Sequence, residues 1–444
     1  MEPAATSNQI YDEPRVCTSH RNGYSFPRMN AVLLIAMGLI GLKWAVEFWL
    51  SRLNRAHVLR HQHAVPDAFC SIIDPATYAK SVQYTLARGQ LGQWESTWST
   101  ILLLAVLISG ALPATLELFT AQFGRSAWAM SGYLFAVGTA LSLAGLPFDW
   151  YGQFRLEERF GFNTTTARLW WLDRFKGFLL AAIIGIPLLA LLLLLANRSG
   201  SWWWLWAWTA MLGFQLLMLV LAPVLILPLF NKFTPLPDGA LRDQLLALAE
   251  RTGFRARSIL VMDGSKRSRH SNAFFTGFGR FRKIVLFDTL MEQLKESELA
   301  AVLAHEIGHY RKGHIPKMLA WSALSLLGGF YALAWMSGQG WFYRAFGFEP
   351  GNLAAAFLLF ALLAGTVTFW FTPLANHWSR CFEYEADAFA ANAMKEETSL
   401  TEALRKLNEK NLSNLTPHPL YSGFYYSHPT LLEREQSLKK LRFA

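Results

Sequence analysis

Two histidines and a glutamate in the stretch LAHEIGHY, residues 303–310, have the types and spacing of a zinc hydrolase centre. His305 and His309 are four residues apart, so a helix would place both side chains on one face, where each can offer a ring nitrogen to a tetrahedral metal. Glu306 would lie about 100° around that helix and could act as a general base on a water beside the metal. The alternative is a pair of surface histidines on a basic helix. We expect one Zn²⁺ per chain.

A catalytic zinc needs a third protein ligand. His314 follows His309 by five residues, which puts it about 140° off the ligand face of one continuous helix, so we expect it among solvent or lipid headgroups. The stretch EYEADAF, residues 383–389, offers carboxylates instead. Glu383 and Asp387 would share a helix face, while Glu385 would point nearly opposite. We assign Glu383 to the metal and Asp387 to the free ring nitrogen of a ligand histidine, and the alternative is an exposed acidic face.

The elements that must position these residues are mostly membrane helices. Of the 444 residues, 53% are hydrophobic and only 16% are charged, which is unusual for a soluble protein. A helix needs about 20 apolar residues to cross the hydrocarbon core. Seven stretches meet this length: 30–50, 97–120, 126–149, 177–197, 202–229, 318–337 and 353–377. The sequence therefore predicts a mainly α, polytopic membrane protein with about seven transmembrane helices.

The basic residues are distributed unevenly between the connections. On one side the connections carry 34 Lys and Arg residues, and on the other side 6, so the positive-inside rule places the N-terminus outside and the C-terminus in the cytoplasm. The net charge of +10 then needs no nucleic acid partner. Lys43 lies inside the first span, four residues before Glu47, and we interpret the two as a self-neutralising structural pair.

The chain divides into five parts on these patterns. We expect a polar leader at 1–29, helices one to five at 30–229, a small cytoplasmic α/β insertion with the zinc helix at 230–317, helices six and seven at 318–377, and a helical C-terminal part with the third ligand at 378–444. Within the insertion, HSNAFFTGFGRFRKIVLF has the pattern of a strand, a turn and a strand. Its first strand could offer an unpaired edge to an extended peptide, with Asn272 and Ala273 as substrate-binding residues.

Several motifs together resemble the integral-membrane CAAX prenyl protease family and the related heat-shock membrane endopeptidases. They are AHEIGHYRKGH, SRCFEYEADAFA and YSHPTLLER, with EERFGFNTTT, LILPLFNKFTPL and HSNAFFTGFGRFRKIVLFDTL before them. The resemblance covers residues from about 150 to 435. It implies a zinc metalloendopeptidase whose helices enclose a chamber with a small cytoplasmic α/β peptidase domain.

The resemblance also implies roles for single residues. It supports His305, His309 and Glu383 as ligands and Glu306 as the base, and it places Asp387 beside the catalytic centre. His428, in YSHPTLLER, matches a residue that helps to bind substrate or to stabilise the oxyanion. Without the resemblance, we would interpret His428 as a residue at the start of a helix.

Two other functions remain open at this point. One is a quality-control endopeptidase for damaged membrane proteins, and the other is a transporter or receptor with a structural zinc. The expected partners are the lipid bilayer and a peptide or protein substrate that could carry a lipid. Weak signals, including a C-terminus without a dilysine retrieval signal, favour a bacterial inner membrane.

Overall fold

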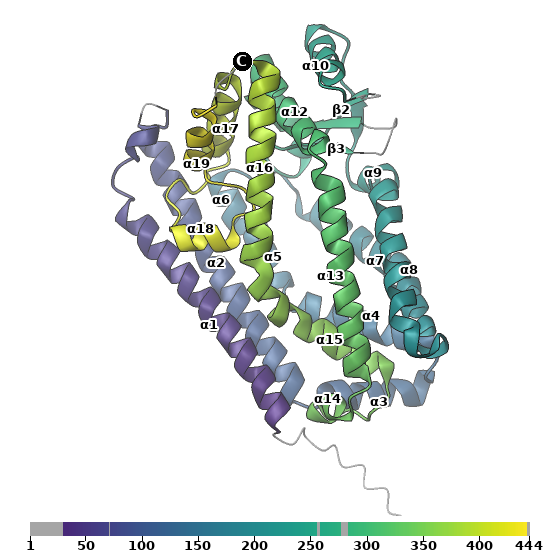
Figure 1. Cartoon of the computed structure of the whole chain (residues 1–444). Helices are drawn as coiled ribbons and strands as arrows, with labels where there is room; N and C mark the ends of the chain where they lie inside the picture. The colour runs from purple at the N-terminus through teal and green to yellow at the C-terminus, as the bar shows by residue number, and fades with distance from the viewer. Residues whose placement is uncertain (1–29, 71, 255–257, 277–282, 442–444) are drawn as a thin grey trace, which may run out of the picture.

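The structure is a computed structural model that describes residues 30–70, 72–254, 258–276 and 283–441. Long helices form most of it (Figure 1). The helices before the sheet are α1 Ala31–Arg60, α2 Pro75–Ile108, α3 Ala111–Phe123, α4 Ala127–Leu143, α5 Leu146–Tyr151, α6 Glu158–Phe160, α7 Ala167–Arg198, α8 Trp203–Leu221 and α9 Leu227–Phe230. The later helices are α10 Ala240–Arg251, α11 Asp288–Gln293, α12 Glu296–Arg311, α13 His314–Ser337, α14 Gly340–Ala345, α15 Leu353–Thr368, α16 Thr372–Met394, α17 Thr398–Lys410, α18 Pro419–Tyr425 and α19 Leu431–Leu438.

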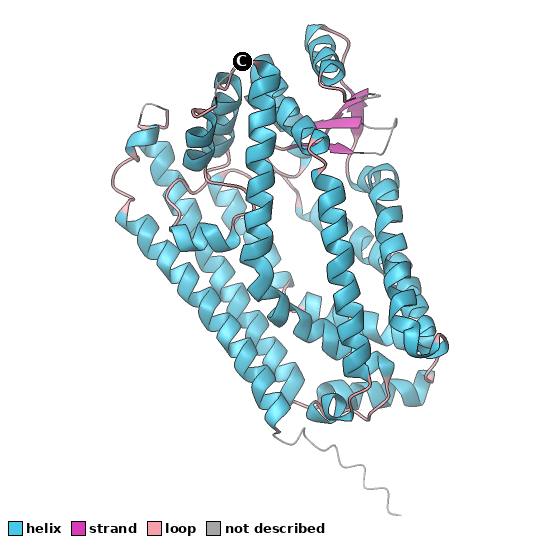
Figure 2. Ribbon diagram, viewed as in Figure 1, coloured by secondary structure: helices cyan, strands magenta, loops and turns pink. Residues whose placement is uncertain are grey.

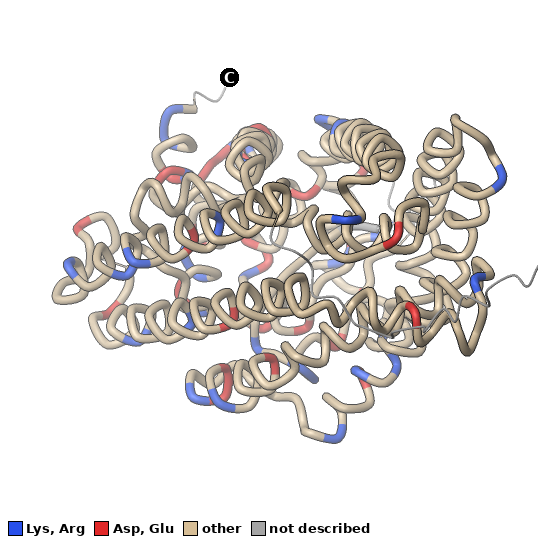
Figure 3. Tube along the Cα trace, turned by 90° about the horizontal axis from the view of Figure 1, so that it is seen from below, with Lys and Arg blue, Asp and Glu red and all other residues tan. Residues whose placement is uncertain are grey.

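Within the described part of the chain, six helices are long and apolar enough to cross a membrane, or seven if the bent pair of α4 with the segment 146–160 counts as one span. They stand side by side along the molecule, and the small helices α3 and α14 close the end opposite the sheet (Figure 1). Seen from that end, most of the trace is uncharged, with charged residues scattered along it (Figure 3). The expectation of a mainly α, polytopic membrane protein is confirmed.

The second expected span, 97–120, is wrong in its placement. The helix there is α2, which runs over Pro75–Ile108, and Gly110 interrupts the chain with a φ of +71° before α3 begins. The apolar pattern alone missed the first half of α2 because that half carries many polar side chains, several of which line an internal cavity. The pair of Lys43 and Glu47 forms as expected, with 2.7 Å between Nζ and Oε1.

The strands lie together at one end of the helices (Figure 2). They are β1 Phe233–Pro235, β2 Ser258–Met262, β3 Ala273–Thr276 and β4 Lys283–Phe287, arranged in the order β1-β2-β4-β3. Strands β2 and β4 are parallel, and the other two pairings are antiparallel. Helices α10 and α12 pack with this sheet into one hydrophobic core that also includes residues of α17 and α19. A second core lies among the membrane helices.

A short connection between membrane helices holds the sheet region in place. Asn163, which follows α6, forms an isolated antiparallel bridge with Ser268. The residues on either side of Ser268 add further links: Arg269 donates its backbone N–H to the Phe162 carbonyl, and Arg267 forms two hydrogen bonds with the Asp173 carboxylate. The segment that leads into β3 is therefore fixed directly to the membrane helices.

Candidate metal centre and active site

The centre is formed where α12 and α16 approach each other most closely. Gly308 of α12 makes this approach possible, because a Cβ atom there would lie 3.0 Å from the Cα and the carbonyl oxygen of Ala386. A Cβ contact of this length is tighter than nine in ten real ones, so a larger residue would require the backbone of α16 to shift away. The close packing brings the histidine face of α12 against the acidic face of α16.

Three of the predicted ligands meet on these faces. Nε2 of His305 and Nε2 of His309 are 3.2 Å apart, and they lie 3.5 and 3.3 Å from the two carboxylate oxygens of Glu383. Each of the three residues offers one ligand atom, and these three atoms all lie within 4.8 Å of one another. Glu383 Oε2 is buried and has no hydrogen-bond partner in the described chain. Two imidazoles and one carboxylate form a donor set that suits Zn²⁺, so the residues fit the expected metal.

Asp387 lies behind His305, as predicted. Its Oδ1 is 2.8 Å from His305 Nδ1, so that Nδ1–H can donate to the carboxylate and Nε2 keeps its lone pair for a metal. Arg434 of α19 donates two hydrogen bonds to the same carboxylate, from Nε at 2.8 Å and from Nη2 at 2.5 Å. Sequence reasoning missed Arg434, since an arginine in an amphipathic helix carries no signal of burial. Arg434 is the last residue of the motif YSHPTLLER, but the motif gave it no role.

His314 contradicts the expectation of a solvent or headgroup residue. Its side chain is 1% exposed and stacks on Phe382, with 4.3 Å between ring centroids. His314 Nδ1 is 2.9 Å from His309 Nδ1, and its Nε2 is 3.1 Å from Glu385 Oε2. The hydrogen-bond pattern requires His314 Nε2–H to donate to Glu385 and His309 Nδ1–H to donate to His314, which leaves His309 Nε2 free for a metal.

The reason for this error lies in the helix boundary. The expectation assumed one continuous helix, but α12 ends at Arg311, and Gly313 takes a φ of +66° before α13 begins at His314. That left-handed residue turns the chain, and the angular offset counted along a single helix no longer applies. Each ligand histidine therefore has a partner behind it: Asp387 behind His305, and His314 behind His309.

Glu306 lies next to the ligands and beside the sheet. It is half-buried, and burial raises its pKa above the ordinary value for a glutamate. Glu306 shares a small apolar void with Ala273 and Phe274 of β3. A carboxylate with a raised pKa accepts a proton more readily, as a general base near neutral pH must.

Strand β3 is an edge strand, as expected. It pairs with β4 through Ala273–Leu286 and Phe274–Val285, and within the described residues it has no strand on its other side. Asn272 is exposed at its start, and its carbonyl accepts a hydrogen bond from Phe287 N–H at 3.2 Å. Because Ala273 lies near Glu306, the free edge runs beside the group that would act as base.

His428 joins the centre from the loop before α19. Its Nε2 is 3.4 Å from Glu383 Oε1, yet the side chain is 63% exposed. Ser427 Oγ is 3.0 Å from the other ring nitrogen. His428 therefore touches the ligand shell and also faces a cavity of about 970 Å³, where it can meet a substrate.

Comparisons with known proteins identify the family of the chain. Residues 54–232 match the family described as CAAX prenyl protease N-terminal, five membrane helices, and residues 235–442 match peptidase family M48. The chain is 39% identical over 322 residues to CAAX prenyl protease 1 of Saccharomyces cerevisiae, covering 69% of this chain and 71% of that protein. It is 35% identical to the CAAX prenyl protease 1 homolog of Arabidopsis thaliana, covering 84% and 90%.

A solved structure has the same fold as this chain. The crystal structure of S. mikatae Ste24p superposes with a TM-score of 0.86 at 33% identity, over 92% of this chain and 99% of that one. The interpretation as a transporter or receptor is therefore set aside. The protein is a membrane-embedded metalloendopeptidase, and the chain belongs to the CAAX prenyl protease 1 family within peptidase family M48.

Proposed function

We propose that this protein is a zinc endopeptidase that cleaves prenylated proteins near their C-termini. The observation that carries the proposal is the placement of the centre: the His305, His309 and Glu383 cluster lies against an edge strand and opens through His428 into a cavity walled by α1 and α2. A prenyl chain keeps its substrate at the membrane, and a cavity between membrane helices can receive such a substrate. CAAX prenyl protease is also the name of the relatives above.

The residues of the chain divide the chemistry among them. A zinc ion held by the three ligands would supply Lewis acidity, which acidifies water and polarises a carbonyl. Glu306 would remove a proton from the attacking water and return it to the leaving amine. His428 would donate a hydrogen bond to the oxygen on which negative charge develops. Asp387, held by Arg434, would keep His305 in the tautomer that leaves Nε2 free.

Binding of the peptide is assigned to the edge of β3. An extended substrate that adds to this edge would gain main-chain hydrogen bonds without a fixed sequence, and Asn272 and Ala273 would line it.

The division of the chain into a leader, two membrane regions, an α/β insertion and a C-terminal part, with the bounds given above, belongs to the same proposal. So does the orientation with the N-terminus outside and the sheet in the cytoplasm.

A reconstituted assay tests the proposed substrate. Purified protein in liposomes is given a farnesylated peptide that ends in a CAAX sequence, its unprenylated counterpart, and an unrelated unfolded membrane protein. Faster cleavage of the farnesylated peptide supports the proposal, whereas preferential cleavage of the unfolded protein supports quality control as the task. The relatives reported above are eukaryotic, so the bacterial inner membrane remains an untested expectation.

A further inference from the structure

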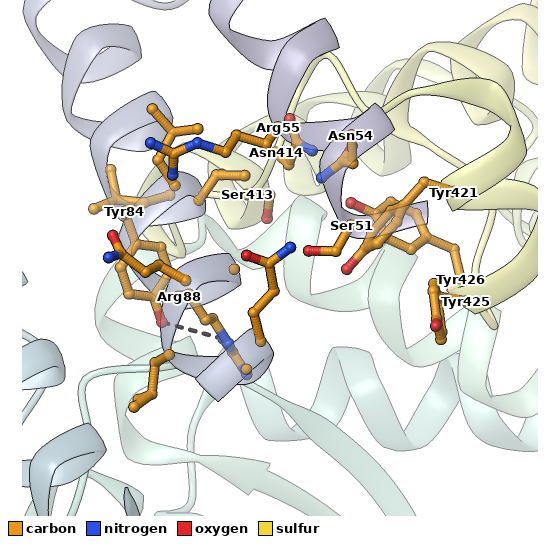
Figure 4. A pocket seen from close by; sticks show the side chains of 18 of the residues that line it. Ser51, Asn54, Arg55, Tyr84, Arg88, Ser413, Asn414, Tyr421, Tyr425 and Tyr426 are labelled. Carbon is orange, nitrogen blue, oxygen red and sulfur yellow. Dashed lines mark hydrogen bonds between the residues drawn. The ribbon is translucent and has the colours of Figure 1, made fainter. Parts of the chain in front are cut away.

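The cavity beside the active site extends far along two membrane helices (Figure 4). His428 and Arg434 line it on the side of the metal centre. Its other walls include the face of α1 from Trp44 to Arg55 and much of α2 from Tyr84 to Thr97. A peptide held at the centre can therefore continue into this cavity. The charged side chains of α1 and α2 would then contact the rest of the peptide.

Two arginines lie at one level of these walls. Helices α1 and α2 run antiparallel, and Ser96 Oγ donates a hydrogen bond to Glu47 Oε2 at 2.8 Å, which sets their register. Arg55 follows Glu47 by eight residues and Arg88 precedes Ser96 by eight, so both lie at the same distance along the pair, about 12 Å from that contact. Both side chains line the cavity (Figure 4).

The Arg88 guanidinium is held in place and keeps most of its donors. Its Nη1 donates to the Tyr84 hydroxyl at 3.1 Å, and that hydroxyl donates to Glu157 Oε1 at 2.7 Å. Over the described ranges of the chain, neither Arg88 nor Arg55 forms a salt bridge. A guanidinium has five N–H donors and no acceptor, so it suits a ligand that is a pure acceptor.

The same network reaches the segment before the substrate-binding edge. Glu157 Oε2 is 3.2 Å from His270 Nε2, and His270 Nδ1 is 3.0 Å from Asn411 Oδ1. His270 lies two residues before Asn272 and stacks on Phe162. The position of Arg88 is therefore connected through three hydrogen bonds to the backbone that leads into β3.

The cavity wall offers further donors. Gln93 Nε2 and Asn414 Nδ2 are buried and have no hydrogen-bond partner within the described residues, and both residues line the cavity. Glu47, the acid on α1, is paired with Lys43, and Glu157, the acid in the hydrogen-bond chain of Arg88, is bound by Tyr84 and His270. Glu95 also lines the cavity, about two helical turns along α2 from Arg88. The region around the two arginines is therefore rich in donors and suited to a carboxylate.

We propose that Arg88 and Arg55 bind the free α-carboxylate at the C-terminus of the peptide substrate. The inference rests on the proposed function, because a CAAX substrate ends three residues after its prenylated cysteine. Three extended residues span about 10 Å, so the carboxylate stays near the bond that is cut. Arginine binds a carboxylate through two parallel N–H···O bonds, and Arg88 is oriented in advance by Tyr84.

The test uses two farnesylated CAAX peptides that differ only at the C-terminus, one with a free acid and one with a carboxamide. For the wild-type protein we expect kcat/KM to be about 10-fold or more higher for the acid, since one charge-assisted hydrogen-bond pair is lost in the amide. Arg88→Gln should lower kcat/KM for the acid by a similar factor and leave the amide unchanged. Arg55→Gln should act in the same direction.

Arg52→Gln is the matched control, because Arg52 is exposed on α1, three residues from Arg55, and stacks on Phe48 instead of lining the cavity. It should keep the preference for the acid. Equal cleavage of both peptides by the wild type overturns the carboxylate subsite and leaves the proposed function intact, and this comparison needs no variant. Cleavage of neither peptide overturns both. An equal loss of both activities in Arg88→Gln assigns that residue a structural role.

Discussion

The metal centre and the cavity wall between α1 and α2 are built in opposite ways. At the centre, the ligands are packed between α12 and α16, and each histidine has its own buried partner. On the cavity wall, Arg55 and Arg88 line a cavity of about 970 Å³, and within the described residues the donors Gln93 Nε2 and Asn414 Nδ2 have no hydrogen-bond partner. The first arrangement holds reacting groups in one geometry, whereas the second can adapt to a ligand.

This difference predicts two kinds of mutational effect. A change at the centre should alter the metal or the chemical step, because the groups there have no room to compensate. A change on the cavity wall should alter which substrate is preferred and leave the reaction itself intact. The following experiments test that division, beginning with the largest effect.

Glu383→Ala should remove the metal and, with it, nearly all activity. The two remaining histidines cannot hold zinc in the way that three protein ligands do. Metal analysis of the purified variant should show well below one zinc per chain. Glu402→Ala is the control, since Glu402 is a glutamate at an exposed position of α17. Normal zinc content in Glu383→Ala would move the third ligand elsewhere.

Glu306→Gln should lower kcat by about 10³-fold while the zinc content stays at the wild-type level, because the amide cannot take a proton. Peptidase assays in liposomes and metal analysis of the same sample measure the two quantities together. This variant should also retain substrates, so that proteomics of its membranes identifies them. A variant that kept most of its activity would contradict the role of Glu306 as the base.

His314→Phe should weaken zinc binding by about 10-fold to 100-fold, the usual effect of losing a partner behind a ligand. The phenyl ring can keep the stacking on Phe382, so the change removes mainly the acceptor for His309 Nδ1–H. Competition with a chelator measures the affinity. His61→Phe, at the exposed end of α1, serves as the control. Unchanged affinity in His314→Phe would show that His309 needs no such partner.

Tyr84→Phe should have the smallest effect, about a threefold loss of the preference for a free C-terminal acid over an amide. The variant loses the hydroxyl that orients Arg88 but keeps the guanidinium and its other donors, so only part of the preference for the acid should be lost. Cleavage of the amide peptide should not change. A loss of zinc or of activity toward both peptides would show that Tyr84 affects the metal centre. That result would contradict the division between the two regions.

The sequence predicted which side chains lie together at the candidate centre because its signals are local. Four-residue spacings place His305 with His309 and Glu383 with Asp387, and these survive in any helix. The membrane class followed from composition, and the edge strand from its pattern before the zinc helix. These features depend on a few neighbouring residues.

The rest depends on contacts between distant segments. His314 was misplaced because one glycine, Gly313, ends the helix and resets the direction of the chain. Arg434 was missed because only the packing of α19 on α16 buries it beside Asp387. Arg88 carried no signal at all, since the register of α1 on α2 decides that it shares a level with Arg55.

The order of the ligands along the chain has a consequence for biosynthesis. His305 and His309 precede α13, whereas Glu383 follows α15 and Arg434 lies in α19. Helices α13 and α15 are therefore synthesised between the first two ligands and the third. A nascent chain has to make and fold these two helices before its three ligands can meet, so the metal centre forms only after this helix pair.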